Sequence, residues 1–303
     1  MAARLFQFGA GKPTEESKEV KKIVPVKMEL SDNTFNELRN FIYDQCGIYY
    51  TDNKKYLLEG RIAKRISTNK LSSFEEYLNF LRSPMGRNEL NELFDAITIN
   101  ETYFFRAPQQ FEAFETHIVP EILSTRQNLF NPVFRIWSAA ASTGEEAYTL
   151  AMIVAEKLRP MYPRVQFQIL ASDINKSVLE QAQQGVYKEY SIRNVPPHLL
   201  KKYFKQQGTN YVLSDEIKQM VKFMNINLYD AQQMRTVTNC DVIFCCNVLI
   251  YFDMPSKQQV VTHLYNSLNK GGYLFIGYSE SLHGISKAFK LVHFPKAMAY
   301  QKE

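Results

Sequence analysis

The chain has 303 residues, of which 45% are hydrophobic and 22% are charged. This composition is typical of a soluble globular protein, and the length allows one large domain or two modest ones. No stretch approaches the roughly 18 uninterrupted apolar residues of a membrane span, and Lys12 and Glu15 interrupt any apolar run suited to a signal peptide. We therefore expect a cytoplasmic protein without membrane insertion. The net charge of +5 is too mild to indicate nucleic-acid binding by itself.

The four cysteines indicate reduced thiols rather than disulfides or a metal site. Cys46 stands alone, and Cys240, Cys245 and Cys246 lie in one apolar run. No CxxC or Cys/His spacing is typical of a metal centre, so no metal is expected. Burial in reduced form is predicted for these thiols.

The first 100 residues divide into a polar tail and a helical unit. Residues 1–27 carry Gly, Pro, Lys and Glu without apolar periodicity, which predicts a flexible tail. Residues 28–100 show helical periodicity and predict a small all-α domain. Ser31 or Asp32 is expected to cap its first helix, and Ser72 with Glu75 has the spacing of a capping box. The apolar positions at helical spacing are Phe35, Leu38, Phe41, Ile42, Leu58, Ile62, Ile66, Tyr77, Leu78, Leu81, Leu90, Leu93, Phe94 and Ile97.

Residues 101–303 alternate between strand and helix patterns, which predicts an α/β domain with a parallel sheet covered on both faces. The expected strands are 133–138, 167–171, 221–225, 241–246 and 273–277. Helices are expected over 145–158 and from about residue 176. The segment 187–222 is longer than an ordinary connection, so we expect an insert with structure of its own there.

The run WSAAASTGEE joins the first expected strand to the first helix of this domain. In a doubly wound sheet that junction lies beside the crevice where ligands bind. Small residues let a ligand approach the backbone, and Gly144 can adopt conformations closed to other residues. A tight turn in which Ser142 or Thr143 caps the helix would give the same pattern, so this run alone leaves ligand binding open.

The carboxylate of Asp173 ends the second expected strand. An acid at this point can accept hydrogen bonds from both hydroxyls of an adenosine ribose, although Asp173 could instead cap the next helix. The multiple-glycine turn that cradles a pyrophosphate is missing. Glu145 and Glu146, in contrast, are suitable neighbours for a sulfonium cation and an amino acid end. The pattern therefore favours S-adenosylmethionine over a nicotinamide cofactor.

The run TINETYFFR lies where the two predicted domains meet. In it, Asn100, Thr102 and Arg106 alternate with aromatic residues that can wall an adenine or methionine pocket. The guanidinium of Arg106 can orient a carboxylate in two-pronged fashion. An interdomain salt bridge is the alternative role for this arginine.

Polar residues also follow the fourth expected strand. Asn247 ends that strand, and Tyr251 comes one helical turn later. Amino-methyltransferases acting on DNA, RNA or protein often carry Asn-Pro-Pro-Tyr at this point. Both prolines are missing here, so a nucleic-acid methyltransferase is an alternative that this chain matches poorly.

Residues 54–70 form a basic stretch in which Glu59 is the one acidic residue. Arg61 and Arg65 share a helix face at i, i+4 spacing, with Lys64 between them. Such a face is either a docking surface for an acidic partner or simply a solvated surface. It lacks the interleaved aromatic residues of a platform for single-stranded nucleic acid.

Five runs in this order resemble the motifs of the CheR-type methyltransferases: TINETYFFR, WSAAASTGEEAYTLAM, LASDIN, NVLIYF and GGYLFIGYSES. The resemblance extends from about residue 28 to the C-terminus. It implies a Rossmann-like class I S-adenosylmethionine methyltransferase domain preceded by a small all-α domain. It further implies a small β-subdomain inserted at 187–222 and a C-terminal antiparallel hairpin at 292–301.

The resemblance also implies an activity and a partner. The family transfers a methyl group from S-adenosylmethionine to glutamate side chains of methyl-accepting chemotaxis receptors, and S-adenosylhomocysteine is the product. The methylated regions of those receptors are helical bundles rich in glutamate. An acidic bundle of this kind would complement the basic stretch, so Arg61, Lys64 and Arg65 are predicted to dock the receptor.

Site residues follow from the same resemblance, position by position. Cofactor contacts are implied for Asn100, Thr102, Arg106, Glu146, Asp173, Asn227, Leu228, Asn247 and Val248. Arg106 and Tyr251 are implied to lie beside the reacting methyl group. Many members carry Arg where this chain has Cys246, so a module that binds the cofactor without turnover is a further alternative.

Overall fold

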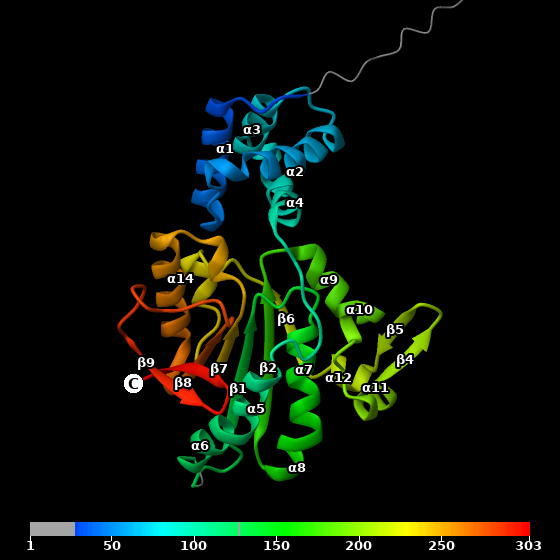
Figure 1. Cartoon of the computed structure of the whole chain (residues 1–303), viewed down its shortest axis with the longest axis vertical. Helices are drawn as coiled ribbons and strands as arrows, with labels where there is room; N and C mark the ends of the chain where they lie inside the picture. The colour runs from blue at the N-terminus through cyan, green and yellow to red at the C-terminus, as the bar shows by residue number, and fades with distance from the viewer. Residues whose placement is uncertain (1–27, 127) are drawn as a thin grey trace, which may run out of the picture.

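The computed structural model describes residues 28–126 and 128–303, and the tail predicted at 1–27 lies outside them. A helical unit sits above an α/β body (Figure 1). The helical unit consists of α1 (Asp32–Cys46), α2 (Lys55–Thr68), α3 (Phe74–Arg82) and α4 (Arg87–Ile97), with the short turns η1 (Asp52–Lys54) and η2 (Pro84–Gly86) between them. The apolar side chains at the predicted helical spacing pack into one core, which runs from Leu30 to Ile97.

Serine caps begin two of these helices. Ser31 caps α1, as predicted, because its side chain accepts a hydrogen bond from a backbone N–H of the first turn. The capping box predicted at Ser72 and Glu75 is wrong by one residue. Ser73 has the extended backbone of a cap, with φ −152° and ψ 167°, and its side chain accepts from the N–H of Glu76. The Glu76 carboxylate accepts in turn from the N–H of Ser72 at 2.7 Å.

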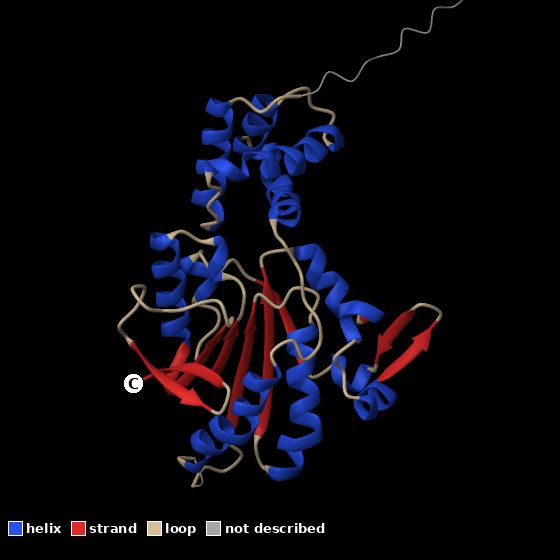
Figure 2. Ribbon diagram, in the orientation of Figure 1, coloured by secondary structure: helices blue, strands red, loops and turns tan. Residues whose placement is uncertain are grey.

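The α/β body is built on a sheet with the strand order β6-β2-β1-β7-β8-β10-β9 (Figure 2). Its parallel strands are β1 (Val133–Ala139), β2 (Gln166–Asp173), β6 (Val221–Asn225), β7 (Cys240–Cys245) and β8 (Leu268–Ile276). The strands β10 (Ala297–Lys302) and β9 (Phe289–Phe294) form the antiparallel hairpin that the resemblance implied. The five predicted strands are confirmed, although β7 ends one residue earlier and β8 begins five residues earlier than expected.

The strand order determines where a ligand can bind. From β1 the chain adds β2 and β6 on one side and then β7 and β8 on the other. The order therefore reverses between β1 and β7, and in open α/β sheets ligands bind outside the carboxyl ends of strands at such a switch point. Alternating side chains of β1 supply both faces, since Ile136 packs in one core and Trp137 in the other.

Helices cover both faces of the sheet (Figure 1). The predicted helix 145–158 is α7 (Glu145–Ile153), which continues through the π-helical η4 (Val154–Leu158) into α8 (Arg159–Met161), and the next predicted helix is α9 (Lys176–Gln184). The sequence patterns left further helices unassigned: α5 (Pro108–Ala113), η3 (Phe114–Ile118), α6 (Val119–Ser124), α13 (Ala231–Met234), η5 (Leu249–Tyr251) and α14 (Met254–Ser267). Among the residues described, no helix combines the length and the hydropathy needed to cross a membrane.

The segment expected to be an insert carries its own small sheet, which stands to one side of the main sheet (Figure 2). Its strands β3 (Val186–Lys188), β5 (Asn210–Leu213) and β4 (Phe204–Gln207) pair antiparallel in that order. The helices α10 (Glu189–Ile192), α11 (Pro197–Tyr203) and α12 (Asp215–Lys218) accompany them. Tyr187 joins this insert to the main body, because its hydroxyl donates to the carbonyl of Thr143 at 2.9 Å.

The helical unit contacts the loops at the carboxyl ends of the parallel strands. Ile48 forms an antiparallel bridge with Phe252, and the N–H of Tyr49 donates to the carbonyl of Tyr251 at 3.1 Å. On the other side, the Asp95 carboxylate accepts from backbone N–H groups at the start of α9, at 3.0 and 3.3 Å. These contacts place the helical unit over the switch point.

Candidate functional site

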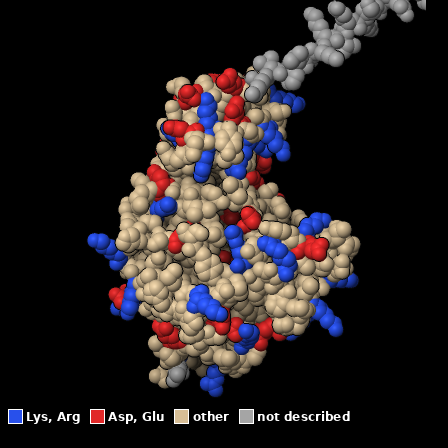
Figure 3. All heavy atoms as spheres, viewed as in Figure 1, with Lys and Arg blue, Asp and Glu red and all other residues tan. Residues whose placement is uncertain are grey.

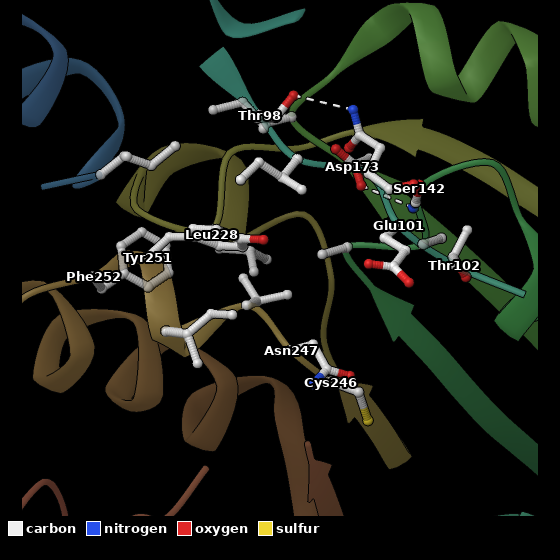
Figure 4. A pocket seen from close by; sticks show the side chains of 18 of the residues that line it. Thr98, Glu101, Thr102, Ser142, Asp173, Leu228, Cys246, Asn247, Tyr251 and Phe252 are labelled. Atoms are coloured by element: carbon white, nitrogen blue, oxygen red, sulfur yellow. Dashed lines mark hydrogen bonds between the residues drawn. The ribbon is translucent and has the colours of Figure 1, made fainter. Parts of the chain in front are cut away.

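A cavity of about 320 Å³ lies between the helical unit and the carboxyl ends of the strands. Every residue predicted to contact the cofactor or the reacting group lines it: Asn100, Thr102, Arg106, Glu146, Asp173, Asn227, Leu228, Asn247, Val248 and Tyr251. Figure 4 shows Asp173 and Ser142 facing Tyr251 and Leu228 across the cavity, with Asn247 and Cys246 at its base. The structure thus brings together residues from segments that lie up to about 150 positions apart in the chain.

The turn between β1 and α7 forms one wall and has an unusual backbone. Ala140, Ser142 and Gly144 have positive φ angles of 82°, 50° and 92°, a region that residues with a side chain rarely adopt. The φ of Gly144 favours glycine, and a Cβ atom there would also lie only 3.0 Å from the Cβ of Ala182, which is a tight contact. The N–H groups of Ala140 and Ala141 hold the turn by donating to the carbonyl of Ser172 at 2.7 and 2.8 Å.

The simple capping role considered for this turn is wrong. Helix α7 has no side-chain cap. Instead, the Ser142 hydroxyl donates to the carbonyl of Asn100 at 3.3 Å, and the Thr143 hydroxyl donates to the Glu145 carboxylate at 2.7 Å. The turn is therefore tied to the segment 98–106, and its small residues face the cavity.

The Asp173 carboxylate lies at the end of β2 and is only 6% exposed. Its oxygens accept from the N–H groups of Ser142 and Asn175, both at 2.9 Å. Burial raises the pKa of this carboxyl to about 6, although these backbone hydrogen bonds act in the opposite direction. Helix α9 is capped by Asn175 rather than by Asp173, so the capping alternative for Asp173 is wrong. Each carboxylate oxygen keeps acceptor capacity for a ligand.

The Glu146 carboxyl lies at the floor of the cavity, within the first turn of α7. It accepts a hydrogen bond from the Ser138 hydroxyl at 2.7 Å. Burial raises its pKa to about 7, partly offset by Ser138, Cys246 and the charge of Arg106. A cationic ligand in the cavity would favour the ionised form of this group.

Arg106 and Tyr251 both line the cavity. Arg106 donates to the carbonyl of Glu101 at 2.8 Å, and within the described residues no carboxylate forms a salt bridge with it. The interdomain salt bridge considered for Arg106 is therefore wrong. Burial raises the pKa of Tyr251, and the charges of Arg106 and Arg61 oppose this effect.

The side chain of Asn227 is already engaged in the structure. Its Nδ2 donates to the carbonyl of Gln45 at 2.7 Å, and its Oδ1 accepts from the N–H of Tyr229 at 3.0 Å. Asn227 therefore links α1 of the helical unit to the loop after β6, next to Leu228 in the cavity wall.

Glu280 was not expected at the site from the sequence, but its carboxylate holds Asn247 and Ile250 in the cavity wall. Its carboxylate accepts from the N–H groups of Gly277, Asn247 and Ile250 at 2.7, 2.9 and 3.2 Å. It thereby holds the turn that contains Asn247, whose φ is 63°, and η5 with Tyr251. Glu280 belongs to the run GGYLFIGYSES, but nothing in its spacing of 33 residues from Asn247 indicates this contact.

Cys246 follows β7 directly, at the position where the resemblance implied an arginine. Its thiol contacts Gln110, with 3.6 Å between Sγ and Oε1, and burial raises its pKa well above the usual range. The other cysteines, Cys46, Cys240 and Cys245, are buried as predicted. Within the described residues, no group of three or more His, Cys, Asp or Glu side chains could hold a metal ion.

The basic stretch differs from the surface that the sequence predicted. Arg65 donates to both oxygens of the buried Glu89, at 2.8 and 2.7 Å, and also pairs with Glu92. Arg61 turns toward the cavity and donates to the carbonyl of Ile97. The expectation that Arg61 and Arg65 project freely is therefore wrong, because α4 covers that face of α2. Lys64 is exposed.

Comparison with known proteins identifies two family models along the chain. Residues 33–98 match the model described as CheR methyltransferase, all-alpha domain, and residues 100–298 match the model described as CheR methyltransferase, SAM binding domain. The chain is 36% identical to chemotaxis protein methyltransferase 2 of Vibrio cholerae, covering 90% of this chain and 94% of that protein. It is 35% identical to the chemotaxis protein methyltransferase of Borreliella burgdorferi, covering 86% and 92%, respectively. For the chemotaxis protein methyltransferase of Escherichia coli the identity is 34%, with coverage of 88% and 90%.

Proposed function

The chain belongs to the CheR methyltransferase family of S-adenosylmethionine-dependent enzymes, and from this premise we propose that it methylates glutamate side chains of chemotaxis receptors. The products are glutamate methyl esters and S-adenosylhomocysteine. The partner is the cytoplasmic helical bundle of a receptor, so the enzyme acts in the cytoplasm. No metal and no nucleic acid take part.

The pairing of Asp173 with the Gly144 turn carries this proposal. Asp173 ends β2, and the turn ends β1, so the two lie side by side at the switch point of the sheet. The Asp173 carboxylate is placed to accept the ribose hydroxyls, while Glu146 lies on the floor of the same cavity. S-adenosylmethionine supplies an electrophilic methyl group on a sulfonium cation when it is bound.

The remaining cofactor contacts come from the other walls. The segment after α4 contributes Asn100, Thr102 and Arg106. The loop after β6 contributes Asn227 and Leu228, and the end of β7 is followed by Asn247 and Val248. These residues are proposed to hold the adenine and the amino acid end. The Asn227 side chain is bonded to Gln45 and Tyr229 and its backbone N–H to Gln233, so Asn227 is proposed to contribute as part of the cavity wall beside Leu228.

Methyl transfer to glutamate requires little acid–base chemistry from the protein. A glutamate carboxylate is already ionised near pH 7, so no general base is needed. Alignment and desolvation of the reactants can lower the barrier by roughly 7–11 kcal/mol when the geometry is held well. We assign Arg106 and Tyr251 to the positioning of the substrate carboxylate, since both side chains line the cavity and neither needs to exchange a proton.

Receptor docking is proposed for the exposed part of α2. Lys64 remains available there, whereas Arg65 stabilises the helical unit through Glu89 and Arg61 faces the cavity. An acidic helical bundle would be attracted to this positive surface over the opening. Of the three residues predicted to dock the receptor, Arg61, Lys64 and Arg65, only Lys64 is therefore retained in this proposal.

The proposal is tested by incubating the protein with tritiated S-adenosylmethionine and membranes from the same cell. Alkaline release of volatile methanol from the protein fraction is expected, because a glutamate methyl ester is labile to base. Label on RNA or DNA would indicate a nucleic-acid methyltransferase. Binding of the cofactor without transfer to any receptor preparation would indicate a module without turnover, in which Cys246 stands in place of a needed arginine.

A further inference from the structure

A cluster of two tyrosines and an arginine lies beside the opening of the cavity. The guanidinium carbon of Arg193 is 3.5 Å from the centre of the Tyr103 ring and 3.7 Å from the centre of the Tyr190 ring. The two rings are 6.3 Å apart and inclined by 74°. Arg193 also donates to the carbonyl of Tyr190. These contacts hold a cation in one place on the surface, since a guanidinium against an aromatic face loses much of its rotational freedom.

The cluster is directly coupled to the proposed reaction site. Tyr103 lines the cavity, and the guanidinium carbon of Arg106 lies 5.7 Å from the centre of the same ring. The Tyr190 hydroxyl donates to the Glu101 carboxylate at 2.9 Å. Arg106 and Arg193 therefore contact one tyrosine ring, the first inside the cavity and the second outside it. Figure 3 shows charged side chains of both signs at this hollow between the helical unit and the insert.

Arg193 has no carboxylate partner in the described part of the chain. It is exposed and forms no salt bridge there. The neighbouring acid, Glu101, is engaged by the Tyr190 hydroxyl. A guanidinium has five N–H donors in a fixed fork, and the carbonyl of Tyr190 uses one nitrogen. The remaining donors are available to a carboxylate of a ligand.

We propose that Arg193 binds a second carboxylate of the substrate, one helical turn from the glutamate that is methylated. Side chains three or four positions apart on a helix are neighbours, about 5–6 Å between Cβ atoms. The guanidinium carbons of Arg106 and Arg193 lie 5.7 and 3.5 Å from the centre of one tyrosine ring, so they are at most 9.2 Å apart, and two extended glutamate side chains one helical turn apart can reach both. When a substrate glutamate contacts Arg106 and Tyr251, a second acidic side chain on the same face of the substrate helix would therefore lie at Arg193. This inference rests on the proposed function and specifies which acidic helices the enzyme accepts.

The test compares Arg193→Gln with Arg159→Gln in the full-length enzyme. Arg159 is exposed on α8, at the far edge of the sheet, so the control removes the same charge. With a cytoplasmic receptor fragment as substrate, Arg193→Gln is expected to lower kcat/KM about tenfold, mainly through KM, because it loses a charge-assisted pair. Arg193→Lys should recover only part of the loss, since it lacks the planar fork. Affinity for S-adenosylhomocysteine and the Tm should match those of the control.

A paired substitution in the substrate locates the contact. Replacing the acidic residue one turn from a methylated glutamate by Gln should lower kcat/KM for the wild-type enzyme and have little further effect on Arg193→Gln. Equal kcat/KM for Arg193→Gln and Arg159→Gln would overturn the inference, and so would a parallel loss of Tm and cofactor affinity. Failure of the wild-type enzyme to methylate any receptor fragment would instead refute the proposed function on which the inference depends.

Discussion

At the scale of single residues, Asp173 has two tasks. It holds the Ser142 turn through a backbone N–H and is proposed to accept the ribose hydroxyls. In Asp173→Ala, the loss of two ribose hydrogen bonds should cost about 1.5–3 kcal/mol, which is more than tenfold in affinity. Calorimetry with S-adenosylhomocysteine measures this loss. Wild-type affinity in a variant that remains folded would contradict the ribose role.

The raised pKa of Glu146 predicts how the free energy of unfolding depends on pH. Burial raises the pKa of Glu146 in the folded protein to about 7, above its ordinary value of 4.5. The folded state therefore binds a proton that the unfolded state has released, and the free energy of unfolding decreases as pH rises from about 4.5 through 7. Glu146→Gln removes this ionisation.

Without cofactor, Glu146→Gln should consequently be more stable than the wild type at pH 8, by about 1–3 kcal/mol. The difference should vanish as the pH falls below 4.5, where the wild-type carboxyl becomes protonated in both states. Urea unfolding at several pH values tests this. Parallel stability profiles for the two proteins would show that Glu146 ionises normally in the fold.

Arg106 is expected to act on turnover more than on folding. Arg106→Ala should reduce methyl transfer at least tenfold, because a group that positions the reactants contributes in the transition state. The Tm should change little, since Arg106 forms one hydrogen bond, to the Glu101 carbonyl. Steady-state kinetics with a receptor fragment measures the effect. Normal kcat and KM in the purified variant would show that Arg106 has only a structural role.

At the scale of elements, the turn after β7 depends on a carboxylate from the loop after β8. Glu280 accepts three backbone N–H groups there, and one of them belongs to Asn247. Glu280→Gln replaces one acceptor oxygen by an amide donor, which cannot accept these N–H groups. The turn that carries Tyr251 should then lose its fixed position.

For Glu280→Gln we expect kcat to fall about tenfold, with Glu216→Gln as the control on the exposed surface of α12. Catalysis should suffer more than folding, so the variant should retain a cooperative thermal transition. Equal kcat in the two variants would show that the Glu280 contacts are not needed for methyl transfer.

Prediction of the elements from sequence succeeded where the periodicity was strong. The central strand β7 is an apolar run because all of its residues are buried. The edge strand β6 also matches the predicted bounds, Val221–Asn225. The helices α5, α6 and α14 were not predicted. Two of them have six residues each, too few for a periodic pattern. All three begin with Pro at one of the first two positions, a helix-start signal that the periodicity did not include. The shifted cap of α3 arose because Ser72 and Ser73 are adjacent, and both precede a glutamate at suitable spacing.

At the scale of the whole molecule, the helical unit forms one wall of the cavity, and its contacts with the α/β body lie next to the site residues. Asp95 accepts from the first N–H groups of α9, which begins three residues after Asp173, and the N–H of Tyr49 donates to the carbonyl of Tyr251. The sequence predicted both the unit and the site residues that now lie together in one cavity. The site residues could be predicted because five motifs of the family occur in the same order along this chain.

The environment of Arg61 and Arg65 could not be predicted in the same way. Helical spacing places them on one face of α2, but it does not say which neighbouring element covers that face. The covering element is α4, whose Glu89 and Glu92 follow more than 20 positions later. The contacts of Glu280 and Arg193 are of the same kind, since each joins segments that are distant in sequence.

The most direct test of the account is to locate the transferred methyl group. After incubation of the enzyme with S-adenosylmethionine and a cytoplasmic receptor fragment, tandem mass spectrometry should find an added methylene mass on glutamate side chains. The label should disappear on mild alkaline treatment and should be absent with S-adenosylhomocysteine alone. Methyl groups on nitrogen or sulfur, or on nucleic acid in a parallel incubation, would contradict the assignment of glutamate as the acceptor.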